Sequence, residues 1–187
     1  MVRSDAGAQR GSGPWIEARK EDTMKAFGRR VLSEGLLAGC IGYAVVLLFF
    51  VILNMAAGRP PLSTAEMLGR ALFFGGVNAD VGVGGAVLAF NGFHLAVFLS
   101  LGLLAAWLVA RAEEGPQFWY LAFTALLFVV LHMLGLLVAA ARALPGALTP
   151  AAVLIASGLA GAAMIYYLWR AHPRLRAEVR TYNDQPI

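Results

Sequence analysis

Charged residues are scarce in this sequence. Only 14% of its 187 residues are Asp, Glu, Lys or Arg, and 59% are hydrophobic, whereas soluble domains carry about 25% charged residues. Four segments contain none of these four residue types: 35–58, 81–110, 115–141 and 143–169. Each segment exceeds the roughly 20 residues with which a helix crosses a membrane. This composition excludes a soluble globular domain and predicts a membrane protein.

The uncharged segments also lack the alternation of polar and apolar residues that is typical of a strand in a membrane barrel. Backbone groups in lipid then find their hydrogen bonds only inside a helix. The sequence therefore predicts an all-α fold, a polytopic bundle of four transmembrane helices. We expect the spans at about 31–57, 83–110, 117–141 and 150–169.

Lys and Arg residues concentrate near the two ends of the chain. Seven precede the first expected span and four follow the last: Arg3, Arg10, Arg19, Lys20, Lys25, Arg29, Arg30, and Arg170, Arg174, Arg176, Arg180. An even number of spans places both termini on one side, and the positive-inside bias makes that side cytoplasmic. We therefore expect a multi-pass protein of a bacterial inner (plasma) membrane, whose basic ends contact anionic lipids. Nucleic acid is not an expected partner, because no recognition motif accompanies the charge.

Composition divides the chain into a membrane domain and two tails. Residues 1–25 are rich in Gly, Ser and charged side chains, which predicts a flexible cytoplasmic tail. Residues 26–171 form the expected four-helix domain. Residues 172–187 are expected to be a cytoplasmic C-terminal tail.

The longest connection, residues 59–80, contains the segment STAEMLGRALFFGG. Ser63 and Glu66 have the spacing of a capping box, and Glu66 and Arg70 have the spacing of a helical ion pair. The apolar residues can share one side of a helix. The segment therefore predicts a short amphipathic helix that lies in the outer membrane interface between the first two spans. A lid over an outer cavity is the alternative.

Motifs for enzymatic chemistry are missing as well. The sequence has no Ser/His/Asp, Cys/His or metalloprotease pattern, so we expect neither enzymatic activity nor a bound metal. The single cysteine, Cys40, excludes an internal disulfide. Because it lies within the first span, we expect it to be a small packing residue.

Two of the three histidines lie deep inside expected spans. His94 precedes Trp107 by 13 residues, and His132 follows Trp119 by 13 residues. Both tryptophans are expected at the inner interface, so both imidazoles lie roughly 20 Å above it at about 1.5 Å per residue. The second and third spans are joined by a short turn and must be antiparallel neighbours. The two histidines are therefore expected to meet at one depth.

Three interpretations of this pair remain open. His94 and His132 can form a buried polar cluster with Asn91, which lies one helical turn from His94 on the same face. They can be the axial ligands of a b-type haem held between neighbouring helices. They can also relay protons or bind a small solute, because polar groups at this depth usually face the bundle interior.

Other polar groups are expected near the ends of the spans. Glu34 lies within a turn of Arg30, which predicts a surface ion pair. His172 follows the last span and is expected to be a solvated residue at the level of the lipid headgroups. Three further residues gather at the outer end with Asn91, either as loop and cap residues or as a polar vestibule: Asn54, Asn78 and Asp80.

Small residues recur at helical spacing in the first and last spans. In the first span these pairs are Gly35/Gly39 and Ala38/Gly42, and in the last they are Ala156/Ala160, Ser157/Gly161 and Gly158/Ala162. Such stripes allow helices to approach closely, either inside the bundle or against a partner chain. We expect a non-enzymatic, structural or accessory membrane protein that self-associates or joins a larger complex. A haem b protein, or a transporter of protons or small solutes that uses His94 and His132, is the alternative.

Overall fold

The computed structural model describes residues 14–112, 120, 124 and 149–172. Four helices account for most of these residues: α1 (Pro14–Ala56), α2 (Ser63–Phe73), α3 (Val83–Ala112) and α5 (Pro150–Ala171). No strand occurs within the described ranges. The expected third span, 117–141, lies outside them except for Tyr120 and Thr124, and His132 therefore lies outside them too.

Three of the helices, α1, α3 and α5, are long and apolar enough to cross a membrane. The prediction of an all-helical membrane protein is confirmed at this level. Helix α3 begins at Val83, the predicted first residue, and α5 begins at Pro150 as predicted. Thr149 is the N-cap of α5 and its side chain accepts a hydrogen bond from the Ala152 N–H at 3.3 Å. A fourth span and an interfacial position for α2 remain predictions.

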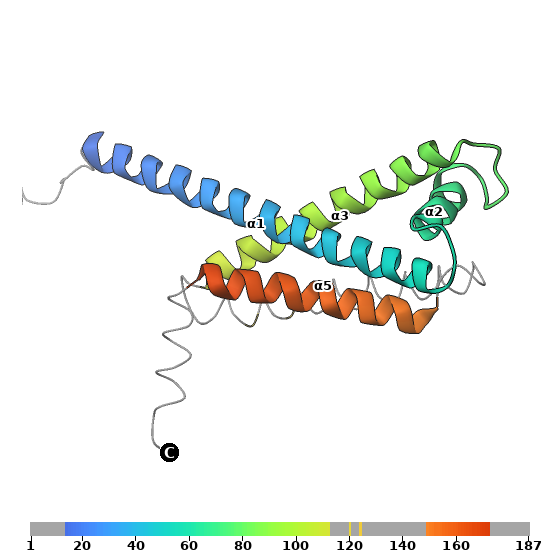
Figure 1. The fold of residues 1–187 in the computed structure, drawn as a ribbon. Helices are drawn as coiled ribbons and strands as arrows, with labels where there is room; N and C mark the ends of the chain where they lie inside the picture. Colours follow the sequence, from blue (N-terminus) through green and yellow to red (C-terminus); the bar gives the residue numbers. More distant parts are fainter. Residues whose placement is uncertain (1–13, 113–119, 121–123, 125–148, 173–187) are drawn as a thin grey trace, which may run out of the picture.

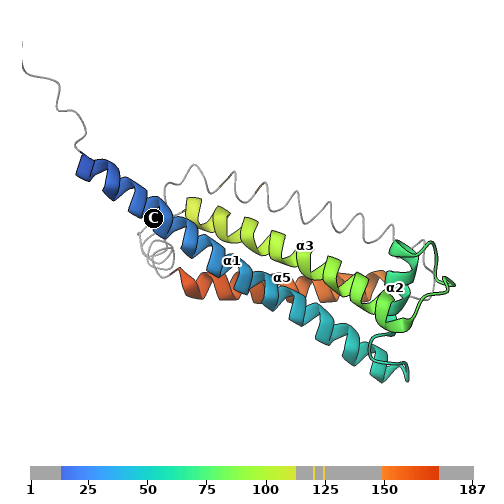
Figure 2. The same ribbon diagram turned by 90° about the horizontal axis from the view of Figure 1, so that it is seen from above.

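Helix α1 is much longer than the predicted span. It begins at Pro14 and has 43 residues, which gives a length of about 65 Å. Figures 1 and 2 show its N-terminal part extending beyond the other helices. Residues 14–25, which composition assigned to the flexible tail, are therefore helical. Local interactions explain the difference: proline suits the first helical turn, and Glu21 pairs with Lys25 at 2.6 Å.

Helices α1 and α3 cross in direct contact (Figure 1). Glycines make the crossing possible, because a Cβ atom at Gly102 would lie 2.2 Å from the Gly35 carbonyl oxygen. A Cβ atom at Gly39 would lie 2.6 Å from the Phe98 carbonyl oxygen. No other residue fits at such separations without moving a backbone. The Gly35/Gly39 stripe is therefore an internal seam.

Helix α5 also packs along α1, and Figure 1 shows these two helices running side by side. Ala156 and Ala160 are buried in a cluster with Val46 of α1, and nearer the other end Leu168 packs in a cluster with Ala38. Two further small residues of α5, Gly158 and Ala162, are exposed. One face of α5 therefore packs against α1, and another face of α5 remains exposed.

The end of the molecule that contains α2 is organised by Asn54. Its side chain is fully buried, donates a hydrogen bond to the Pro61 carbonyl at 3.0 Å and accepts one from the Thr64 hydroxyl at 3.0 Å. Gly58, with φ of +69°, lets the chain turn after α1. Asn54, in the last turn of α1, therefore has the structural role of holding the loop that follows.

The predicted capping box of α2 does not form. Leu62 is the N-cap and no side chain caps the helix, while the buried Ser63 hydroxyl has no hydrogen-bond partner within the described ranges. The reason is register, since Ser63 is already the first helical residue. The predicted ion pair is confirmed, with Arg70 3.0 Å from Glu66. A Cβ atom at Gly69 would clash with the Ala86 carbonyl, so α2 lies directly on the start of α3.

Candidate functional site

His94 lies near the middle of α3 in an aromatic environment. The rings of Phe90 and Phe98, one turn before and after it on the same helix, have centroids 5.1 and 5.0 Å from the imidazole. The ring of Tyr43, on α1, lies at 6.2 Å. We call Tyr43, Asn91 and His94 the central cluster. It lies between two helices that are both long enough to cross a membrane.

Asn91 connects these two helices. Its side-chain oxygen accepts a hydrogen bond from the Tyr43 hydroxyl at 3.1 Å, and its amide donates to the Val87 carbonyl at 3.0 Å. No hydrogen bond within the described part of the chain joins Asn91 to His94. The sequence pattern did not identify Tyr43, although a hydroxyl within the apolar run of the first span was a usable signal.

The imidazole of His94 has one unsatisfied nitrogen in this environment. Its Nε2 atom is buried and makes no hydrogen bond to any residue that the structure describes. His132, the expected partner, lies outside the described residues. The pairing of His94 with His132 therefore stays a prediction. A buried nitrogen of this kind can accept a proton or a hydrogen bond, or ligate a metal.

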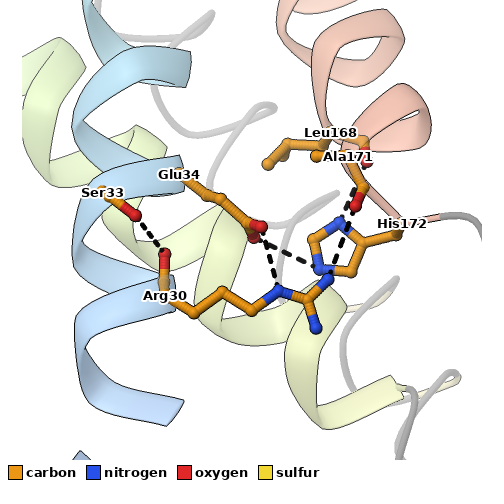
Figure 3. Close-up of polar contacts among 6 residues, drawn as sticks. All are labelled: Arg30, Ser33, Glu34, Leu168, Ala171 and His172. Atoms are coloured by element: carbon orange, nitrogen blue, oxygen red, sulfur yellow. Dashed lines mark hydrogen bonds and ion pairs between the residues drawn. The ribbon is translucent and has the colours of Figure 1, made fainter. Parts of the chain in front are cut away.

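A second polar group lies at the opposite end from α2, between α1 and the end of α5. Figure 3 shows Arg30 and Glu34 of α1 facing His172. The Arg30 Nε–H donates to Glu34 Oε1 at 2.9 Å, and the His172 Nε2 atom lies 3.3 Å from Glu34 Oε2. A guanidinium nitrogen of Arg30 also lies 3.5 Å from the Ala171 carbonyl. We call Arg30, Glu34 and His172 the charged cluster.

His172 was expected to be solvated, and this expectation is wrong. Its side chain is 0% exposed. It caps the end of α5, where its backbone N–H donates to the Leu168 carbonyl at 3.1 Å. Its ring Nδ1 lies 3.0 Å from the same carbonyl (Figure 3). The cap conformation thus turns the ring back toward α1, where the predicted Arg30–Glu34 pair, confirmed by the structure, covers it.

The charged cluster joins α1 to the end of α5. One carboxylate lies between a guanidinium and an imidazole. Arg30 also places a positive charge near the C-terminal carbonyls of α5, where the helix dipole is negative. Sequence reasoning missed this site because 138 residues separate Glu34 from His172.

Two other expectations concern possible ligands. Cys40 is an exposed free thiol on α1 and not a buried packing residue. Within the described ranges, no three His, Cys, Asp or Glu side chains gather as a metal site.

Comparison of the chain with protein-family models, curated proteins and solved structures gives no match.

Proposed function

We propose that this chain is a non-enzymatic membrane component that associates with a second copy of itself, within a membrane assembly, through the outer face of α5. The observation that supports the proposal is the division of the small residues of α5. Ala156 and Ala160 are buried, whereas Ser157, Gly158 and Ala162 are exposed. Among the described residues, a Cβ atom at Gly158 would contact nothing within 4 Å.

An exposed glycine in a helix needs a reason. Glycine costs about 1 kcal/mol relative to alanine in a helix interior. At Gly35 and Gly39 this cost is offset by the close approach of α3, but at Gly158 no approach by a residue that the structure describes offsets it. Association of α5 with another helix would supply the same close contact, since small residues four apart let two helix backbones meet.

Disulfide trapping in native membranes tests the proposal. In a Cys40→Ser background, we expect Gly158→Cys and Ala162→Cys to give a disulfide-linked dimer on mild oxidation. Leu48→Cys on α1 and Leu88→Cys on α3 are controls, because both side chains are highly exposed but lie on other helices. Equal dimer yields at all four positions would indicate random collision.

A bulky substitution gives the complementary test. Gly158→Ile should raise the dimer dissociation constant about tenfold, which corresponds to about 1.4 kcal/mol. Gly84→Ile is the control, because Gly84 is an exposed glycine of α3 with no described atom within 4 Å of an added Cβ, and the residue four positions on is the large Leu88. A protein that is strictly monomeric in native-like lipid contradicts the proposal. Co-purification with a different membrane protein would instead support membership of a larger complex.

The buried Nε2 of His94 favours a second candidate function, the transfer of protons or a small solute, or the binding of haem b, together with His132. Haem binding requires space at Nε2, so the side chains around this buried atom would have to move. A proton needs no such space, and we prefer proton transfer as this second function. Its test is proton uptake by vesicles that contain the protein, which His94→Phe should abolish.

An absorption spectrum of the purified protein tests the haem form separately. A Soret band that disappears on His94→Ala or His132→Ala would support axial ligation. A colourless preparation would exclude haem and leave proton transfer to be judged by the vesicle assay.

A further inference from the structure

We propose that the C-terminal end of α2 inserts into the membrane leaflet at its end of the bundle and binds the acyl chains of the lipids there. The inserting residues are Leu72, Phe73 and Phe74, which we call the apolar tip. Insertion of this tip is independent of any association through the outer face of α5.

Helix α2 uses only part of its apolar surface to pack on the rest of the protein. Leu68 is buried in a cluster with Val153 of α5. The apolar tip has the opposite environment, since its three side chains, in chain order, are 55%, 44% and 41% exposed. The apolar side that the sequence predicted for this helix is therefore divided, and its C-terminal part faces away from the bundle.

The charged side chains of α2 have the reverse arrangement. The Arg70 Nε–H donates to Glu66 Oε1 at 3.1 Å, and a second guanidinium N–H donates to the Ala79 carbonyl. The side chains of Arg70 and Glu66 are only 19% and 26% exposed. A surface in water places charged groups outward and large apolar groups inward. Here the charges are paired within the protein and the large apolar groups are outside, which is the arrangement that a lipid contact requires.

The backbone just after the apolar tip is also satisfied internally. The N–H groups of Phe74 and Gly76 both donate to the Arg70 carbonyl, at 3.1 and 3.2 Å. Gly75, with φ of +82°, allows the chain to turn back at this point. Lipid offers no hydrogen bonds to a backbone, so these two bonds lower the cost of placing the tip in the leaflet.

Contact with α3 indicates the depth of the tip. The Phe73 ring packs edge-on against the Phe93 ring, with the centroids 5.7 Å apart. Helix α3 has 30 residues, so it is about 45 Å long and exceeds a hydrocarbon core of about 30 Å. If the excess is shared equally, the core begins about five residues into α3. Phe93 comes ten residues after Val83, the start of α3, and is 53% exposed, so the ring that Phe73 contacts lies among the acyl chains.

The residue types of the tip favour lipid over a second protein chain. Contacts between helices in membranes use small residues that let two backbones approach, as the outer face of α5 offers. The tip instead presents three large side chains at the end of a short helix, and it continues onto Phe93 of a helix long enough to cross the membrane. Short helices with Leu and Phe on one side bury these residues about 5–10 Å into the boundary between headgroups and acyl chains.

Collision measurements on spin-labelled full-length protein in lipid nanodiscs test the insertion. In a Cys40→Ser background, labels at Leu72→Cys and Phe74→Cys should collide readily with oxygen and poorly with a water-soluble nickel complex, because the core excludes water. Leu48→Cys, an exposed position of α1, is the lipid control, and Asn78→Cys, exposed in the loop after α2, is the water control. The oxygen-to-nickel ratio at the tip should match that at Leu48 and exceed that at Asn78 several-fold.

Two results of this measurement overturn the proposal. A ratio as low as that at Asn78 would show that the tip faces water. Poor collision with both reagents would show that another protein surface, such as a second copy, covers the tip.

A charge placed in the tip gives a complementary test. Leu72→Glu should lower the oxygen-to-nickel ratio of a label at Phe74→Cys several-fold, because a carboxylate is costly among acyl chains and draws the tip toward water. Asn78→Glu is the matched control and should leave this ratio unchanged. A ratio that Leu72→Glu does not change, or that both substitutions lower equally, contradicts insertion of the tip.

Discussion

His94 and His172 are both histidines with a buried Nε2, but their surroundings differ. His94 lies among aromatic rings near the middle of α3, and no described residue hydrogen-bonds its Nε2. His172 lies at the end of α5, where both nitrogens face oxygen atoms and Glu34 supplies a negative charge. The comparison shows that the depth of a histidine in a span and the presence of a charged partner beside it are separate properties. The histidine outside the apolar run has the charged environment.

The largest effect is expected when the charged cluster loses its carboxylate. Glu34→Ala leaves Arg30 and the buried His172 facing each other without a negative charge. We expect a loss of about 2–3 kcal/mol in the free energy of unfolding, somewhat less than for a wholly buried pair. Unfolding by sodium dodecyl sulfate, followed by circular dichroism in mild detergent, measures it.

Glu21→Ala is the control for this substitution. It removes the same residue type from an i,i+4 pair with Lys25, but both side chains are more than half exposed. The expected change is below about 0.5 kcal/mol. Equal losses for the two variants would show that the charged cluster contributes no more than a surface ion pair.

A smaller effect is expected at the polar contact of the central cluster. Asn91→Ala leaves the Tyr43 hydroxyl without the acceptor that now lies 3.1 Å away, so we expect a loss of about 1 kcal/mol in the same assay. Tyr43→Phe should cost a similar amount, and the double variant should cost less than the sum. Ser100→Ala is the control, since among the described residues the Ser100 hydroxyl donates only within its own helix, to the Ala96 carbonyl. Additive losses would show that Tyr43 and Asn91 act independently.

The smallest effect on stability is expected at His94. His94→Phe removes a buried nitrogen that has no hydrogen-bond partner in the described ranges and keeps an aromatic ring between Phe90 and Phe98. The free energy of unfolding should change by less than about 0.5 kcal/mol or increase. His172→Phe is the comparison and should be clearly destabilising, because it leaves Glu34 unpaired on that side. A loss above about 1 kcal/mol for His94→Phe would indicate a hydrogen bond from a residue outside the described ranges.

The sequence predicted the helices better than the contacts between them. The starts of α3 and α5 were predicted at Val83 and Pro150, because uncharged runs and a Thr-Pro cap are local signals. The start of α1 was predicted too late, since the Gly-rich composition of residues 1–13 was extended over a helix that begins at Pro14. The predicted capping box at Ser63 does not form because the register of α2 depends on the preceding turn. Asn54 holds this turn through its hydrogen bond to the Pro61 carbonyl.

The candidate sites were predicted only in part. Asn91 and His94 lie in the apolar helix α3 and their role as a site stays a prediction, whereas Tyr43 was missed and His172 was placed in solvent. A single sequence reports which side chains are unusual in lipid, and the Tyr43 hydroxyl within the apolar run of the first span was such a signal. The sequence does not report which neighbouring helix such a side chain faces.

The sequence by itself determined that the protein is helical and suited to a membrane, because hydrophobic length and the absence of charge are properties of each segment alone. Tertiary structure alone decided which small residues pack between the helices of this chain. Gly35, Gly39 and Gly102 are in backbone contact, while Gly158 remains exposed. It also decided that Glu34 and His172 meet, because an ion pair between residues so far apart in sequence depends on how two helices pack and not on either helix alone.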